Sequence, residues 1–383
     1  MPCRGSTRKS DSKRRKMAMT KLLYITNGIN GAAGLERVLS IKANALASMG
    51  YDVHIAVLND GGVNPVYPFS AQITIHSIRY FGSFYRATRM YLSAIRKLVQ
   101  SVKPDVISVC DDGFKAFLLP HFIDFRCPVV YERHVSKIVD LGPTPGALKA
   151  LLVQMKYKIM NRLATKFDRF VLLTEANREE WHLRRITVIP NPLPFFPESP
   201  AALDQKVVIA IGRHAYVKGY DRLLEVWKCV LQEHPDWQLH IYGKIEPTLR
   251  LAQLAEKLQI NQAVHFLPPV QNIEDKLRNA SVLAFTSRGE GFGMVLIEAM
   301  ACGVPVVSFD VPYGPKEILA TGRAGFLIPE GDCELMARRL SELITSKSLR
   351  EKMGAAGRQE AVRYQTDAVI AQWHSLFNSL LYK

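Results

Sequence analysis

The chain has 383 residues, of which 48% are apolar, and it contains 50 Lys+Arg against 35 Asp+Glu. This length fits two domains of about 100–200 residues each, and the apolar share excludes a globally disordered or collagen-like chain. No segment approaches the ~18 uninterrupted apolar residues of a membrane span, and the first 20 residues lack the apolar core of a signal peptide. Six scattered cysteines without a C-x-x-C pair argue against a disulfide framework or a structural metal site, so we expect a reducing, cytoplasmic location.

The net charge of +15 is divided unevenly along the chain. Seven Lys/Arg and one Asp give residues 1–20 a charge of +6, and we expect this segment to be a disordered basic leader. Residues 21–195 hold 22 basic and 13 acidic residues, for a charge of +9, whereas residues 196–383 hold 21 of each. The first half is therefore expected to meet an acidic partner.

Strands and helices alternate in the first half, and the predicted strands are apolar throughout. This pattern is typical of a parallel sheet covered on both faces. In chain order we predict strand 21–27, a glycine-rich loop, helix 35–50, strand 53–58, helix 84–102, strands 105–109 and 128–132, helix 146–165 and strand 169–174.

A segment with five prolines, residues 190–205, interrupts the alternation and is the predicted linker between domains 21–195 and 196–365. The pattern then restarts with strand 207–212, helix 221–234, strand 238–243, helix 248–258, strands 264–267, 282–287 and 305–310, and tail helices broken near Gly354 and Gln365. The predicted fold is α/β, with two Rossmann-like doubly wound domains facing across a cleft. A ligand is expected in that cleft, at the carboxyl ends of the strands.

The most specific motif is VLAFTSRGEGFGMVLIEAMACG, residues 282–303. It predicts a strand, a glycine loop and a helix that starts near Gly293, an arrangement that presents free N–H groups and the positive end of a helix dipole. Two carboxylates eight residues apart flank this start: Glu298 could accept the hydroxyls of a ribose, and Glu290 could lie under a sugar ring. The alternative is a solvated Glu290 and a Glu298 that forms a local salt bridge.

Two cations follow the first strand of the second half, in the segment IGRHAYVKGYDRLL (211–224). Arg213 as a bidentate fork and Lys218 as a point charge could together hold a diphosphate. Taken alone, they are also explained as two surface cations of a loop.

Together these motifs resemble the family 4 glycosyltransferases, which are retaining enzymes of the two-domain GT-B fold. The resemblance rests on G-R-x4-K-G at 212–219, the E-x7-E pair Glu290/Glu298, and the stretch 280–307. It extends through VPYGPKEIL (311–319) and, more weakly, over NGINGAAGLERVL (27–39) and IPNPL (189–193), so it spans nearly the whole chain after residue 20.

The resemblance implies a role for each motif residue. Arg213 and Lys218 would bind the donor diphosphate and neutralise the leaving nucleotide, and Glu298 would hold the ribose. Glu290 would face the donor sugar, and the segment Gly291, Phe292 and Gly293 would contact its hydroxyls. Two cations and a helix N-terminus can stabilise a departing diphosphate without a metal, so we expect no cofactor and no metal site. The sequence has no isolated D-x-D motif, which agrees with metal independence, although the pair Asp111–Asp112 keeps this observation from being decisive.

Two sites of the first half complete the prediction. Gly31 and Gly34 lie where the family has a glycine-rich loop near the donor, although the usual paired glycines are replaced by Gly31-Ala32-Ala33-Gly34. His134 falls where family members often carry a catalytic histidine near the reacting sugar. The alternative is a loop histidine partnered with Glu132.

The acceptor side is expected in the basic half. Segments 79–103 and 149–169 mix cations with aromatic and aliphatic residues at helical spacing. Such helices can lie on an anionic membrane, or they can be ordinary helices with one core-facing and one solvated side. No nucleic-acid motif accompanies the charge. The resemblance also implies that helix 366–383, with Trp373, crosses back to the first domain.

We therefore expect a metal-independent, retaining glycosyltransferase that moves a hexose or N-acetylhexosamine from a nucleotide sugar, preferably a UDP-sugar. Its acceptor would be a glycan or lipid-linked molecule of bacterial cell-surface polysaccharide, lipopolysaccharide or capsule synthesis, reached at the inner face of the membrane. A nucleotide-sugar epimerase on the same fold and a non-catalytic, membrane-associated sugar-nucleotide-binding subunit are the alternatives. Only a transferase forms an acceptor-dependent product.

Overall fold

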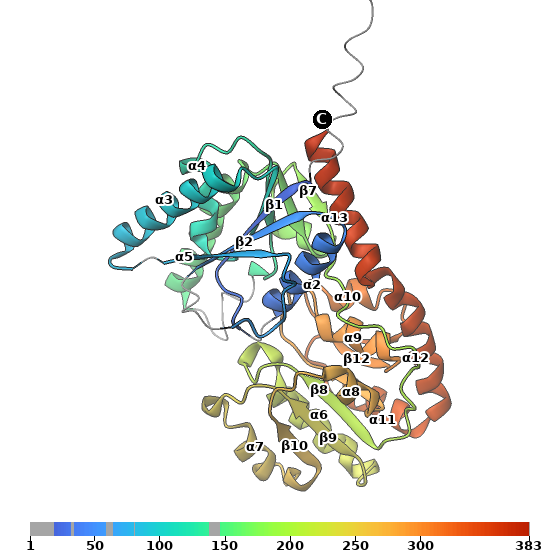
Figure 1. Cartoon of the computed structure of the whole chain (residues 1–383). Helices are drawn as coiled ribbons and strands as arrows, with labels where there is room; N and C mark the ends of the chain where they lie inside the picture. Colours follow the sequence, from blue (N-terminus) through green and yellow to red (C-terminus); the bar gives the residue numbers. More distant parts are fainter. Residues whose placement is uncertain (1–18, 32–33, 59–63, 80, 138–145, 383) are drawn as a thin grey trace, which may run out of the picture.

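The computed structural model describes residues 19–31, 34–58, 64–79, 81–137 and 146–382, and most of the predicted leader lies outside these ranges. Two separate parallel sheets form the framework (Figure 1). The first has the order β3-β2-β1-β4-β5-β6-β7, and the second the order β10-β9-β8-β11-β12-β13. All the strand pairs are parallel, so the carboxyl ends of the strands lie at one edge of each sheet.

The strands of the first sheet are β1 (Lys21–Thr26), β2 (Asp52–Leu58), β3 (Thr74–Ile78), β4 (Val106–Cys110), β5 (Val129–Glu132), β6 (Arg169–Leu172) and β7 (Ile186–Val188). Its helices are α2 (Gly34–Ser48), α3 (Phe84–Val102), α4 (Leu119–Phe122) and α5 (Ala147–Ala164). The central strands β1 and β4 are almost wholly buried, which explains their uninterrupted apolar sequences.

The strands of the second sheet are β8 (Val207–Ile211), β9 (Gln238–Tyr242), β10 (Val264–Leu267), β11 (Val282–Phe285), β12 (Val306–Asp310) and β13 (Gly325–Pro329). Its helices are α6 (Tyr220–Glu233), α7 (Leu251–Lys257), α8 (Ile273–Arg278), α9 (Met294–Cys302), α10 (Pro315–Ile318), α11 (Cys333–Thr345) and α12 (Lys347–Ala361). An apolar core lies on each face of this sheet, as on the first. The fold is thus the predicted pair of Rossmann-like domains.

The last helix, α13 (Thr366–Leu381), returns to the first domain and lies alongside α2, as predicted (Figure 1). Its side chains Trp373 and Phe377 are buried in the core that also contains residues of β1 and β2. The two chain segments that connect the domains run side by side, because the Leu193 N–H donates to the Tyr364 carbonyl at 2.7 Å. None of the described helices is long and apolar enough to cross a membrane.

The predicted helix break near Gly354 is wrong. Helix α12 continues through Gly354, and the break lies at Ser346, whose hydroxyl accepts a hydrogen bond from the Leu349 N–H and caps α12. Gly354 serves packing instead: a Cβ at this position would lie far inside van der Waals contact of the Gly303 carbonyl oxygen at the end of α9. A glycine inside this helix therefore marks a close helix approach.

Candidate active site

A cavity of about 760 Å³ lies between the two domains, where the carboxyl ends of both sheets face each other. The predicted residues that line it are Gly34, His134, Arg213, Lys218, Glu290, Gly291, Phe292, Gly293 and Glu298. Gly31 is not among its lining residues. The fold therefore brings motifs that are more than 150 residues apart in the sequence into one site.

Lys218 is held in place by the end of the neighbouring strand. The Thr286 hydroxyl donates to the Lys218 carbonyl at 3.0 Å, and the Arg288 N–H donates to the Val217 carbonyl at 2.7 Å. The Arg288 guanidinium also forms a two-pronged contact with Asp221, at 2.8 and 2.6 Å. This clamp fixes the turn that carries Lys218 relative to the 287–293 loop. Arg288 and Thr286 were not singled out from the sequence, because their role is to hold backbone.

Lys218 and Glu290 face each other in the cavity. The Lys218 Nζ lies 2.6 Å from Glu290 Oε1, which also accepts a hydrogen bond from the Ser287 hydroxyl at 2.6 Å. Arg213 is exposed at the cavity wall, and within the described residues its guanidinium contacts no carboxylate. The site thus offers an ammonium that already holds one anion and a guanidinium that is open to another.

The N-terminus of α9 is the second positive feature of the site. Its N-cap residue, Gly293, has φ +98, a conformation that favours glycine, and no side chain of the described residues caps the helix. Met294 and Val295 of the first turn line the cavity. The N-terminal end of α9 therefore borders the cavity, as in helix-terminal anion sites.

Glu298 is paired across the domain boundary. Its side chain is nearly fully buried, and its Oε1 accepts a hydrogen bond from the Arg37 guanidinium of α2 at 2.8 Å. Burial raises the pKa of the Glu298 carboxyl, although Arg37 acts in the opposite direction. The salt bridge is not the local one considered from the sequence, because it joins residues 261 positions apart. Arg37 was missed; its place in the first turn of α2, three residues after Gly34, was the only signal.

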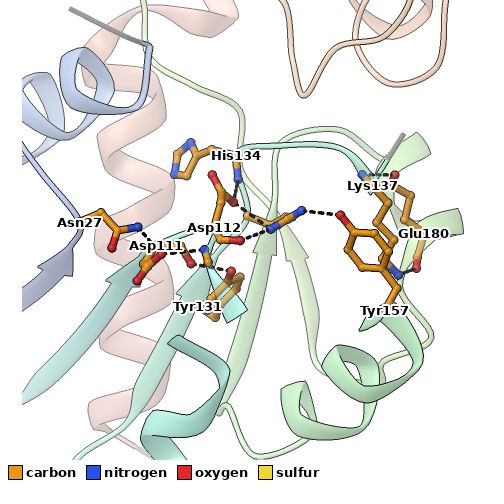
Figure 2. Close-up of polar contacts among 10 residues, drawn as sticks. Asn27, Asp111, Asp112, Tyr131, His134, Lys137, Tyr157 and Glu180 are labelled. Carbon is orange, nitrogen blue, oxygen red and sulfur yellow. Dashed lines mark hydrogen bonds and ion pairs between the residues drawn. The ribbon is translucent and has the colours of Figure 1, made fainter. Parts of the chain in front are cut away.

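His134 both lines the cavity and contacts Glu132. Its Nε2 lies 3.2 Å from Glu132 Oε2. Its backbone N–H donates to Asp112 Oδ1 at 3.1 Å (Figure 2). The two interpretations of His134 are therefore not exclusive. The contact with Glu132 orients the ring, and it is made by Nε2 and not by Nδ1. Asp112, which follows β4 and was considered from the sequence only as part of the pair Asp111–Asp112, also lines the cavity.

The two domains touch beside this histidine. A Cβ on Gly291 would lie far inside van der Waals contact of the His134 carbonyl oxygen. Only a glycine at 291 lets the 287–293 loop approach the His134 loop this closely.

Each half of the chain matches a known family. Residues 194–360 match the family described as Glycosyl transferases group 1, and residues 32–194 match Glycosyltransferase Family 4. A Haemophilus influenzae protein named as an uncharacterized glycosyltransferase is 30% identical over 366 residues, which cover 94% of this chain and 100% of that protein. The chain belongs to the family 4 glycosyltransferases.

Other relatives agree with this assignment. The amylovoran biosynthesis glycosyltransferase AmsD of Erwinia amylovora is 28% identical over 94% of this chain and 100% of its own length. A crystal structure of a TarM variant of S. aureus, in complex with fondaparinux, α-GlcNAc-glycerol and UDP, has a TM-score of 0.80 at 16% identity, covering 94% of this chain and 100% of that one. The structural likeness identifies the fold of this glycosyltransferase as GT-B.

Beneath His134, the glycosyltransferase contains a buried network that the motifs did not reveal. The Lys42 ammonium of α2 forms an ion pair with Glu132, whose Oε1 also accepts a hydrogen bond from the Ser108 hydroxyl at 2.6 Å. Burial alone would raise the pKa of the Glu132 carboxyl, but Lys42 and His134 lower it to about 2. The Lys42 Nζ lies 3.9 Å from the centre of the Trp373 ring, so the network reaches α13.

The same network contains a set of residues with metal-binding chemistry: ligand atoms of Cys110, Glu132 and His134 lie within 4.8 Å of one another. The residues do not fit a metal, because the Lys42 ammonium already binds Glu132 and would repel a divalent cation. Burial also raises the pKa of the Cys110 thiol well above its usual range, which disfavours the thiolate that a metal needs.

Proposed function

We propose that this glycosyltransferase moves a hexose or N-acetylhexosamine from a UDP-sugar to a glycan or lipid-linked acceptor in bacterial cell-surface polysaccharide biosynthesis. The observation that carries the proposal is the cluster of Lys218, Arg213 and the α9 N-terminus in one cavity with His134. The names of its relatives support the substrate class, since AmsD is named for amylovoran biosynthesis and the TarM complex contains UDP and α-GlcNAc-glycerol.

In this proposal the two cations act on the leaving group. As the bond between the sugar and the diphosphate breaks, negative charge develops on the diphosphate, and Lys218, Arg213 and the N–H groups of α9 stabilise it. A diphosphate would take over Lys218 from Glu290, which would then be available to the sugar hydroxyls. We propose that these groups suffice without a metal, and that transfer retains the configuration of the donor sugar.

The first test is binding of UDP by titration calorimetry in the presence of EDTA. Lys218→Ala is expected to weaken binding by about 1.5–3 kcal/mol, the range for a charged hydrogen bond. Lys228→Ala, which removes an exposed lysine from the outer face of α6, is the matched control and should bind as the parent protein does. Unchanged UDP affinity in Lys218→Ala would contradict the assignment of Lys218 to the diphosphate. A strict requirement of UDP binding for a divalent cation would contradict metal independence.

The second test separates a transferase from a protein that only binds the nucleotide. Glu290→Gln keeps the shape of the side chain but removes the charge that we assign to the sugar. It should retain UDP binding and lose most of the release of UDP from UDP-sugars in the presence of an extract of envelope glycans. Full release by this variant would contradict the assigned role of Glu290.

A further inference from the structure

Helix α5 exposes an apolar stripe on the side that faces away from the core. Leu148, Leu151, Leu152, Met155 and Ile159 are 71%, 53%, 56%, 51% and 47% exposed, respectively. Their spacing places them on one side of the helix. Among the described residues, no other helix exposes more than one large apolar side chain.

This stripe is not the side that stabilises the fold. Tyr157, Met160 and Ala164 form the opposite, buried side of α5 and pack into the core beneath the first sheet. A helix on the surface of a globular protein needs one apolar side, whereas α5 has two. An exposed apolar surface of this kind marks an interaction site.

The charged residues of α5 itself all have one sign. Lys149, Lys158 and Arg162 of α5 are exposed, and α5 contains no acidic residue.

Helix α3 continues this basic surface. Its exposed cations are Arg86, Arg89, Arg96 and Lys97, and it too lacks Asp and Glu. The helices are joined through α4, because Arg96 donates to the Phe122 carbonyl at 2.7 Å and His121 Nε2 lies 3.1 Å from the Leu163 carbonyl. Figure 1 shows α3, α4 and α5 on the side of the first domain away from α13.

The inner side of α5 is also connected to the active site. Tyr157 of α5 lies within 3.5 Å of the Arg133 guanidinium, which in turn contacts Asp112 beside His134 (Figure 2). The Lys137 ammonium lies 5.0 Å from the centre of the Tyr157 ring, in the segment that follows His134. The buried side of α5 is therefore linked through these contacts to the residues beside His134.

We propose that the apolar stripe of α5 and the cations of α3 and α5 dock this enzyme on an anionic phospholipid bilayer. The apolar side chains enter the headgroup boundary, and the cations pair with anionic headgroups. The part of this inference that concerns a lipid-linked acceptor rests on the proposed function, but the docking itself does not. A second copy of the chain is a poorer occupant, because its own basic face would repel this one.

The test is co-sedimentation of the full chain with vesicles that contain phosphatidylglycerol and with vesicles of phosphatidylcholine alone. The parent protein should bind the anionic vesicles, weakly or not at all the neutral ones, and less as salt is added. Lys158→Gln/Arg162→Gln should bind about thirtyfold more weakly, since each cation near the surface contributes ~1 kcal/mol. Lys228→Gln/Lys257→Gln, which removes two exposed lysines of the second domain, is the control and should bind as the parent does.

The apolar stripe has its own variant. Leu151→Ser/Leu152→Ser/Met155→Ser should lose at least tenfold in vesicle binding while UDP still raises its melting temperature, which shows that it is folded. Ile245→Ser removes a side chain of similar exposure, 51%, from the second domain and should leave vesicle binding unchanged.

Three outcomes would overturn the proposal: full binding by the stripe variant, equal binding to neutral and anionic vesicles, or a parent dimer that the stripe variant converts to a monomer. Vesicle binding needs neither donor nor acceptor, so its failure would leave the proposed function intact. Conversely, a protein that binds vesicles but not UDP would disprove only the proposed function.

Discussion

At the scale of single residues, the buried pair Lys42–Glu132 is a part of the site that lies outside its sequence motifs. Lys42 is 1% exposed and Glu132 is 1% exposed, and the two side chains form an ion pair. A buried ion pair contributes little net stability when intact, whereas removal of one partner leaves an uncompensated charge. We therefore interpret the pair as the support that fixes the imidazole of His134.

Lys42→Met should lower the free energy of unfolding by about 3–5 kcal/mol, because Glu132 would remain buried without its cation. Denaturant unfolding followed by fluorescence measures this loss. Lys228→Met, at an exposed position of α6, should change stability by less than about 0.5 kcal/mol. The double variant Lys42→Met/Glu132→Gln should recover part of the loss, and a purely additive result would contradict a direct coupling.

Glu132 also predicts a dependence of stability on pH. Its pKa is about 2 in the folded protein against an ordinary value of 4.5, so the folded state favours the ionised form. This contribution is fully present above pH 4.5 and is lost as the pH falls from 4.5 toward 2. The parent should therefore lose stability more steeply over this interval than Lys42→Met/Glu132→Gln, and parallel pH profiles would refute the assignment.

At the scale of elements, most helices and strands could be predicted because their apolar patterns are strong. The structure adds β3, β7 and β13, which the sequence analysis missed. All three are edge strands. The residues of β3 and β7 are mostly exposed or half-buried, and β13 is a short segment, GFLIP, whose terminal Gly and Pro are depleted in strands. Each of them pairs with the strand that precedes it in the chain, β2, β6 or β12.

The packing of α12 on α9 gives a prediction at this scale. Gly354→Ala should lower the stability of the protein by about 1–3 kcal/mol, because the added methyl group would collide with the Gly303 backbone. Gly357→Ala, in the same helix, places its Cβ at an ordinary 3.5 Å from its neighbours. It should be neutral or slightly stabilising, since alanine favours a helix over glycine. Thermal unfolding distinguishes the two variants, and equal melting temperatures would contradict the close approach.

The candidate site shows the same division between what the sequence reveals and what it hides. Lys218, Glu290 and Glu298 could be predicted because each lies in a local motif of fixed spacing. Arg37 and Lys42 could not, because a cation in an amphipathic helix ordinarily indicates a solvated side. Their partners lie 261 and 90 residues away, so only the assembled cleft and the buried face of α2 identify them.

At the scale of the whole molecule, specific contacts join the two domains. Arg37 reaches Glu298, and the backbone of Gly291 lies against that of His134. These contacts place the motifs of the second domain opposite the histidine. The relative position of the domains is therefore part of the active site.

Gly291→Ala tests this dependence. The added methyl group would hold the domains apart at His134, and a misplacement of about 1 Å at a reacting centre can cost about 10²-fold in rate. We expect kcat/KM to fall by about that factor while UDP affinity changes little, because Lys218 and Glu298 remain in place. Gly146→Ala, where a Cβ meets nothing within 4 Å, is the control. An unchanged rate in Gly291→Ala would show that transfer does not need this approach.

The return of α13 to the first domain also affects the order in which the protein is made. The first domain is built from residues at both ends of the described chain, and the second domain is an insertion within it. During synthesis the seven strands of the first sheet emerge early, but the apolar surface that α13 covers stays open until residues 366–381 have left the ribosome. The second domain, although translated later, can complete its core first. The nascent first domain therefore keeps an exposed apolar surface until α13 is made. We expect this period of synthesis to be the one most prone to aggregation and most dependent on chaperones.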